Sequence, residues 1–142
     1  MSIEKELEKL KSNGEAPEWL TPEGFSTISG GYLLKGETPK DMWMRCANAS
    51  AARLNNPALA KKFFEAMWKN WLCLASPVAS NMGTERGLPI SCYGAYVEDS
   101  IVGIMNTLKE IAILSKHGGG IGTFWGDVRP RGATIKDNGH SD

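Results

Sequence analysis

Hydrophobic residues in the first 74 positions recur at the three-and-four spacing of amphipathic helices. A short charged helix is predicted ahead of Gly14. Thr21-Pro22 and Thr38-Pro39 each pair a capping threonine with a proline suited to the first helical turn, and Asn56-Pro57 begins a further helix. The clearest apolar face of the chain belongs to this last helix. It comprises Ala60, Phe63, Phe64, Met67, Trp71 and Leu74. Because only a few residues join the two longer helices, we expect them to pack antiparallel.

The pattern changes in the last third of the chain. Residues 89–97 (PISCYGAYV) are rich in β-formers and predict a strand. Asp99 or Ser100 then caps a helix that ends at Gly118, and residues 121–125 predict a second strand. The apolar face of this helix comprises Ile101, Ile104, Met105, Leu108, Ile111 and Ala112. The order strand, helix, strand favours a parallel pair.

Composition narrows the class of protein. The 142 residues correspond to one ordinary domain, and 42% hydrophobic residues with five tryptophans can build a core. The formal net charge is zero, which gives no electrostatic case for binding nucleic acid or a membrane surface. No apolar run reaches membrane-spanning length, and the acidic, lysine-rich start is unlike a signal peptide. We therefore expect a cytoplasmic protein with neither nucleic acid nor membrane as a partner.

The three cysteines are widely spaced and odd in number, which indicates neither a disulfide framework nor a metal site. Cys46 and Cys73 are expected on or near apolar helix faces, where a free thiol behaves as a small hydrophobe. Cys92 is in the first predicted strand. From the pattern alone, a buried strand thiol is its simpler interpretation.

Glycines and arginines follow the second helix of this half. Gly118–Gly120 and Gly122 exceed what a helix end needs, and extra glycines let a ligand or another strand approach the backbone closely. The spacing fits neither a phosphate-binding loop nor the dinucleotide fingerprint. Arg129 and Arg131 then lie in a loop with Pro and Gly. Guanidinium groups presented this way suit phosphate, although a solvated basic loop explains them equally well.

Several short motifs occur in one order along the second half of the chain. They are Ala75-Ser76-Pro77 with Asn81-Met82-Gly83-Thr84, Leu88-Pro89-Ile90-Ser91-Cys92, Asp99-Ser100, Ser115-Lys116 with Gly118–Gly122, and Arg129 with Gly132. In order and spacing they resemble the large (alpha) subunit of ribonucleotide reductase. The helical first half is similar to the all-helical N-terminal region of that family.

The resemblance implies an α/β fold that is mainly α in its first half. Residues 1–74 would form the all-helical N-terminal region. Residues 75–142 would form the first βα units of an incomplete ten-stranded reductase barrel, with an effector-binding helix and loop. The implied activity is that of a ribonucleoside-diphosphate reductase, which converts ribonucleotides to deoxyribonucleotides by thiol and radical chemistry for DNA synthesis.

The resemblance also gives roles to the residues at the substrate. Cys92 matches the cysteine that reduces the ribose and becomes half of a disulfide in each turnover. Ser76 and Ser91, each expected beside a strand, match residues that contact the ribose and diphosphate of the substrate nucleotide.

A second set of residues matches the site for the dNTP or ATP effector. Asp99 would bind the deoxyribose hydroxyl of the effector, in addition to its possible role as a helix cap. Arg129 would approach the effector phosphates, and Lys136 matches a second cationic position. The loop from Arg129 to Asn138 would then couple effector binding to the substrate site.

The partners follow from what the family reaction requires and this chain lacks: a radical cysteine, a second redox cysteine and a C-terminal cysteine pair. The chain alone is expected to be inactive and is either a truncation or half of a split reductase completed in trans by the remainder of the alpha subunit.

No cofactor is expected on this chain. The radical would come from a di-metal small (beta) subunit or adenosylcobalamin, the reducing equivalents from thioredoxin or glutaredoxin, and the 100–117 helix would form a homodimer. The alternative is a non-catalytic nucleotide-binding or dimerisation module that retains the effector site.

Overall fold

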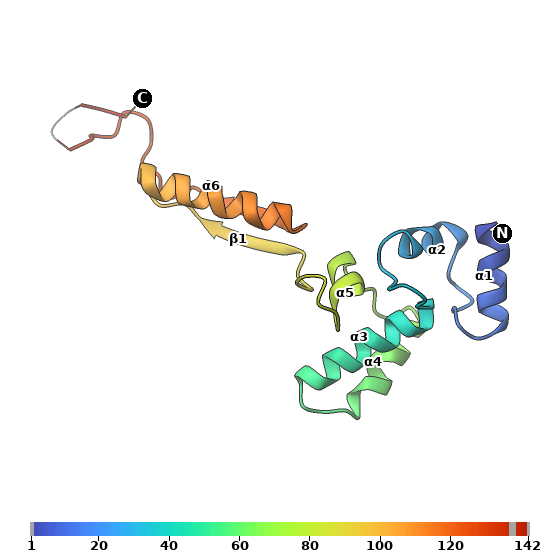
Figure 1. Cartoon of the computed structure of the whole chain (residues 1–142). Coiled ribbons are helices and arrows are strands. Elements are labelled where there is room, and N and C mark those ends of the chain that lie inside the picture. Colours follow the sequence, from blue (N-terminus) through green and yellow to red (C-terminus); the bar gives the residue numbers. More distant parts are fainter. Residues whose placement is uncertain (1, 137–138, 142) are drawn as a thin grey trace. The chain divides into compact units, whose positions relative to one another are not determined.

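The computed structural model describes residues 2–136 and 139–141, and the chain divides into two compact units, Met1–Pro89 and Ile90–Asp142. The first unit contains α1 (Ile3–Ser12), α2 (Pro22–Ser29), α3 (Pro39–Arg53), α4 (Leu59–Trp68) and α5 (Ser76–Asn81), and the second contains β1 (Cys92–Tyr96), α6 (Ile101–Lys116) and β2 (Gly120–Phe124) (Figure 1). Helices followed by a strand, a helix and a strand confirm the predicted fold class. None of the helices in the described residues has the length and apolarity needed to cross a membrane.

Threonine caps begin α2 and α3, as predicted. The Thr21 hydroxyl accepts from the backbone N–H of Gly24 at 3.1 Å. Thr38 and Asp41 form a capping box in which each side chain accepts from the backbone N–H of the other residue. The pKa of Asp41 lies below its ordinary value because the Thr38 hydroxyl and backbone N–H both donate to the carboxylate.

The end of α4 differs from the prediction. The apolar pattern continues to Leu74, but the helix ends at Trp68 and Asn70 adopts a left-handed conformation with φ of 58°. The chain therefore turns away from the helix axis, and Trp71 and Cys73 are exposed. Their predicted places on apolar helix faces are wrong. The Trp71 ring instead lies 4.8 Å from the ammonium group of Lys69.

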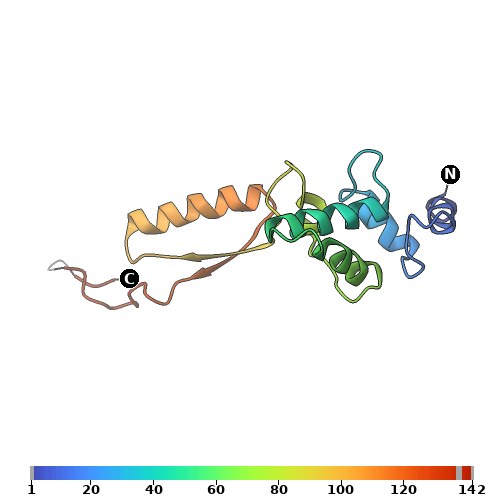
Figure 2. The same cartoon turned by 90° about the horizontal axis from the view of Figure 1, so that it is seen from below.

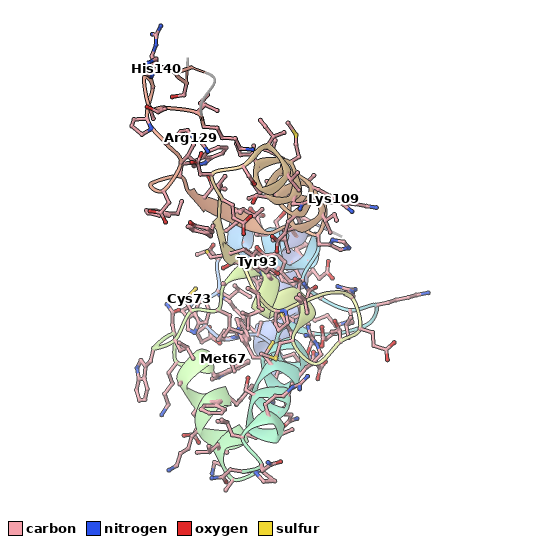
Figure 3. The ribbon with its side chains drawn as sticks, turned by 90° about the vertical axis from the view of Figure 1, so that its left-hand side faces the viewer. Met67, Cys73, Tyr93, Lys109, Arg129 and His140 are labelled. Carbon is pink, nitrogen blue, oxygen red and sulfur yellow. The ribbon has the colours of Figure 1, made fainter. Side chains whose placement is uncertain are left out.

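The core of the first unit lies around α3, which packs along α4. Met42, Cys46 and Ala47 of α3 are almost completely buried, and Met67 of α4 lies at the same interface (Figure 3). Cys46 is buried, which confirms its prediction as a small core residue, and this burial raises the pKa of its thiol. Trp43 packs against two further indoles, with ring centroids 5.5 Å from Trp19 and 5.9 Å from Trp68.

In the second unit, β1 and β2 pair in parallel, with Cys92 opposite Gly120 and Tyr96 opposite Phe124. This confirms the predicted parallel pair. Helix α6 lies along the strand pair (Figure 2), and the Thr107 hydroxyl donates to the Tyr96 carbonyl at 3.2 Å. Val97, at the end of β1, is completely buried.

Helix α6 is apolar on two faces. Ile104 and Ile111 are half-buried. Ile101, Met105 and Leu108, predicted on the same face, keep 73%, 57% and 46% of their surface exposed. The predicted single apolar face is therefore divided, because the two strands cover only part of the helix circumference. Gly118, with φ of 83°, ends the helix as predicted.

Candidate functional site

A hydroxyl and a thiol lie side by side where β1 begins. Ser91 Oγ is 3.4 Å from Cys92 Sγ, and the Ser91 carbonyl accepts from the backbone N–H of Gly120 at 2.9 Å. The first residue of β2 therefore fixes the backbone that carries both groups. Cys92 is exposed in this chain, so the simpler interpretation as a buried strand thiol is wrong.

Beyond Cys92, glycines leave one face of the strand pair without side chains. Alternate strand residues share a face, so Gly94 and its partner Gly122 follow Cys92 and Gly120. A Cβ added at Gly94 or Gly122 would meet nothing within 4 Å. Another group can therefore approach the backbone closely beside the thiol.

Gly119 is a glycine because the ring of Tyr93 in β1 lies close to its backbone. A Cβ at Gly119 would lie 2.5 Å from Cε2 of Tyr93, so a side chain there would displace that ring. The prediction that these glycines allow close approach is confirmed at this position.

An aromatic pair follows Gly94 and Gly122 on the same face of the two strands. Tyr96 and Phe124 stack with ring centroids 6.2 Å apart, and both are exposed. The Tyr96 hydroxyl donates to Asp127 at 3.0 Å, and this hydrogen bond raises the pKa of Tyr96. The open face thus runs from a thiol at one end to an aromatic surface at the other.

The two main candidates for effector binding form an ion pair. Arg129 Nε donates to Asp99 Oδ2 at 2.7 Å, and the two side chains keep 36% and 35% of their surface exposed. The helix cap is Ser100, whose hydroxyl accepts from the backbone N–H of Gly103 at 2.9 Å. The cap role of Asp99 is therefore wrong, because Ser100 occupies the N-cap position.

A cavity of about 260 Å³ adjoins this ion pair. Its lining combines the charged pair with a hydroxyl and three isoleucines: Asp99, Ser100, Ile101, Ile104, Arg129 and Ile135. A Cβ at Gly103 would lie 2.6 Å from the Glu98 Cβ, so only glycine lets the first turn of α6 pack against the turn that carries Asp99. The isoleucines and Gly103 lacked a sequence signal for this site, because they match ordinary helix and loop positions.

Lys136 is exposed, with φ of 46°, and is not among the residues that line the cavity, although its neighbour Ile135 is. Thr134, two residues before it, forms an antiparallel β-bridge with His140. Asn138, the predicted end of the effector loop, lies outside the described residues.

Ser76 belongs to the first compact unit, whereas Ser91 and Cys92 belong to the second. It is the exposed first residue of α5, so its expected place beside a strand is wrong. Its Oγ accepts a hydrogen bond of 2.5 Å from the hydroxyl of Tyr32, a residue that the sequence did not single out. No group of three His, Cys, Asp or Glu within the described ranges is arranged to hold a metal ion.

Two family models match almost the whole chain. The model of the "Ribonucleotide reductase, all-alpha domain" matches residues 18–87, and the model of the "Ribonucleotide reductase, barrel domain" matches residues 90–142. The chain belongs to the ribonucleotide reductase family. The resemblance seen in the sequence motifs is thereby confirmed.

Individual reductases show the same similarity. The chain is 36% identical over 124 residues to the ribonucleoside-diphosphate reductase subunit alpha of Helicobacter pylori and covers 16% of that protein with 82% of its own length. It is 37% identical over 125 residues to the large subunit of Danio rerio, again spanning 16% of the relative with 83% of its own length. The solved class Id ribonucleotide reductase alpha subunit of Actinobacillus ureae shares 42% identity at a TM-score of 0.74, over 86% of this chain and 24% of that one.

Proposed function

We propose that this chain is the N-terminal part of a ribonucleoside-diphosphate reductase alpha subunit, which reduces ribonucleotides to deoxyribonucleotides for DNA synthesis. The observation that carries the proposal is the Ser91–Cys92 pair in a chain of the reductase family. The pair lies at the start of a parallel strand pair, next to Gly94 and Gly122. A nucleotide can reach this thiol because Gly94 and Gly122 leave the neighbouring backbone bare.

Cys92 is proposed as one of the two thiols that reduce the ribose. In the overall reaction, two thiols give up two electrons and two protons and become a disulfide, while the 2′-hydroxyl leaves as water and a hydrogen takes its place. The second thiol would come from the remainder of the alpha subunit. Ser91 and Ser76 would donate hydrogen bonds to the substrate nucleotide, since a hydroxyl can donate to an anionic oxygen without adding charge.

Asp99, Arg129 and Lys136 are proposed to bind a dNTP or ATP effector. The Asp99 carboxylate can accept from a deoxyribose hydroxyl, and the Arg129 guanidinium can bind phosphate oxygens. The adjoining cavity, with its isoleucine walls, provides an apolar surface for the rest of the nucleotide. Lys136 would supply a second cation for the effector phosphates.

The same proposal assigns partners. The remainder of the alpha subunit would complete a barrel that begins near residue 75, and a radical-generating small subunit with a di-metal centre would supply the radical. Adenosylcobalamin is the other possible radical source, and thioredoxin or glutaredoxin would restore the thiols. The exposed apolar residues of α6 support a homodimer through this helix. A cytoplasmic location remains part of the proposal, as does a domain boundary between residues 74 and 75.

The test is Cys92→Ser in an alpha subunit that contains this chain, assembled with its small subunit. We expect multi-turnover reduction to fall by on the order of a thousandfold or more, while the affinity for a ribonucleoside diphosphate changes by less than about twofold, because the hydroxyl retains the shape but cannot form a disulfide. Cys73→Ser, which removes another exposed thiol, is the matched control and should keep full activity.

Normal turnover by Cys92→Ser would remove this residue from the reaction. If the assembled wild-type protein binds dNTP but reduces nothing, the chain is instead a non-catalytic nucleotide-binding or dimerisation module. The Asp99–Arg129 pair and the adjoining cavity are the observations that favour this non-catalytic nucleotide-binding function.

A further inference from the structure

The hydroxyl of Tyr32 donates to Ser76 Oγ across 44 positions of sequence, at 2.5 Å. Ser76 is exposed, so water could satisfy its hydroxyl and burial alone does not require this contact. We propose that Tyr32 is a positioning residue that orients the Ser76 hydroxyl toward the substrate. This inference rests on the proposed role of Ser76 in substrate binding and adds the residue that sets its hydrogen-bond direction.

Two arginines hold the loop that carries Tyr32. Arg86 donates through Nη1 to the Gly31 carbonyl at 3.3 Å and through Nη2 to the Leu33 carbonyl at 3.2 Å. Arg45 donates through Nη2 to the carbonyl of Tyr32 itself at 3.4 Å. Three consecutive carbonyls thus accept from guanidinium groups, and charged donors make stronger hydrogen bonds than neutral ones. The backbone of Tyr32 is therefore anchored on both sides.

The same Arg45 also holds the helix of Ser76. It donates to the carbonyls of Ala79 at 3.1 Å and Met82 at 2.5 Å, at the C-terminal end of α5. Glu37 fixes the guanidinium in turn, with Nε 2.8 Å from Oε1, and the two side chains keep only 11% and 8% of their surface exposed. One buried ion pair therefore sets the position of both partners in the hydroxyl contact.

The direction of the hydrogen bond determines what Ser76 can do. A serine hydroxyl has one proton and two acceptor sites. When Tyr32 donates into one acceptor site, the Ser76 proton must point elsewhere, and the exposed side of the residue is where an anionic oxygen of a nucleotide can accept it. Hydrogen bonds in a chain polarise one another, so a Ser76 hydroxyl that accepts from a phenol is also a better donor. Tyr32 thus acts on the diphosphate or ribose through Ser76 and does not touch the substrate.

The experiment compares Tyr32→Phe, Ser76→Ala and the double variant in the assembled reductase. Tyr32→Phe keeps the ring that packs against the core of the first unit and removes only the hydroxyl. We expect KM for a ribonucleoside diphosphate to rise about tenfold in Tyr32→Phe, the effect of one hydrogen bond to a charged group, with kcat within about twofold. Ser76→Ala should raise KM at least as much, and the double variant should match Ser76→Ala, because Tyr32 has nothing left to orient. Ser29→Ala, which removes a hydroxyl that donates to the Phe25 carbonyl within α2, is the control and should leave KM unchanged.

Additive losses in the double variant would overturn the proposal, because Tyr32 would then act independently of Ser76. An unchanged KM in Tyr32→Phe beside a raised KM in Ser76→Ala would also overturn it, while leaving the substrate role of Ser76 intact. If neither variant changes KM, the substrate role of Ser76 fails as well. A lower melting temperature of Tyr32→Phe without a KM change would show a purely structural contact and refute positioning.

Discussion

Arg129 Nε lies 2.7 Å from Asp99 Oδ2, so the loop after β2 is joined to the turn before α6. The two principal candidates for effector binding therefore satisfy each other. Both side chains are about one-third exposed, so solvent screens the pair and its separation should cost little. A nucleotide that offers a hydroxyl to Asp99 and phosphates to Arg129 can replace the pair and still leave both side chains with a hydrogen-bond partner.

Arg129→Ala tests this exchange. Loss of the guanidinium removes the proposed phosphate contact, so affinity for a dNTP effector should fall about tenfold or more. Affinity for a ribonucleoside diphosphate should change by less than about twofold. Titration calorimetry with each nucleotide separately gives both values, and Arg131→Ala, from the same loop, is the matched control. Equal losses for both nucleotides would contradict the assignment.

Gly103→Ala should disturb the turn that carries Asp99. The new Cβ would lie 2.6 Å from the Glu98 Cβ, and that atom cannot move without shifting the backbone before α6. Overpacking of this kind typically costs about 1–3 kcal/mol, measurable by urea unfolding, and effector affinity should fall with it. Gly31→Ala, where a Cβ meets nothing within 4 Å, is the control. Unchanged stability and effector binding would mean that the turn tolerates the shift.

Arg45→Met should destabilise the first unit by about 3–5 kcal/mol, because Glu37 would remain buried without its partner. The carbonyls of Ala79 and Met82 would also lose their donor. Urea unfolding monitored by tryptophan fluorescence measures the change, with Arg53→Met at the end of α3 as the control. Replacing Glu37 by Leu in the same variant should recover part of the loss. A change below about 1 kcal/mol would contradict the clamp role of Arg45.

The capping box of α3 predicts a pH-dependent contribution to stability. Asp41→Ala should cost about 1 kcal/mol at neutral pH, as loss of a cap contact usually does. The pKa of Asp41 is lower in the folded state, so its contribution is fully present above the ordinary aspartate pKa and disappears as pH falls through the lower folded value. The difference in unfolding free energy between Asp41→Ala and wild type should therefore vanish in acid. Glu23→Ala, from the first turn of α2, is the control, and a difference that persists at low pH would exclude the ionised contact.

If α6 forms the homodimer contact through its exposed apolar residues, charged substitutions on this face should weaken the dimer. Met105 and Leu108 are 57% and 46% exposed, and a lysine at both positions would place charge within an apolar contact. The dissociation constant of the homodimer should rise about a hundredfold, which sedimentation velocity can measure. Glu110→Ala, an exposed position on another side of the same helix, should leave the constant unchanged. A dimer unaffected by the double substitution would place the contact elsewhere.

Much of the local structure follows from short-range signals. Thr38-Pro39 correctly predicts the start of α3, and the β-forming residues of β1, followed by a helix and a second strand, correctly predict the parallel strand pair. The sequence pattern fails to predict where α4 ends and which conformation Ser76 adopts. The apolar pattern of α4 continues through Trp71, but the left-handed Asn70 ends the helix first. Ser76 begins a helix, although the motif around it had indicated the approach to a strand.

By itself, the sequence determined the family, the class of fold and the candidate thiol, because caps, glycines and motif order depend on neighbours within a few positions. Only the tertiary structure decided which distant groups meet. The Asp99–Arg129 pair joins positions 30 apart, and the Tyr32–Ser76 contact joins positions 44 apart. Such contacts depend on how packed helices and strands bring loops together, and no local pattern of residues specifies that geometry.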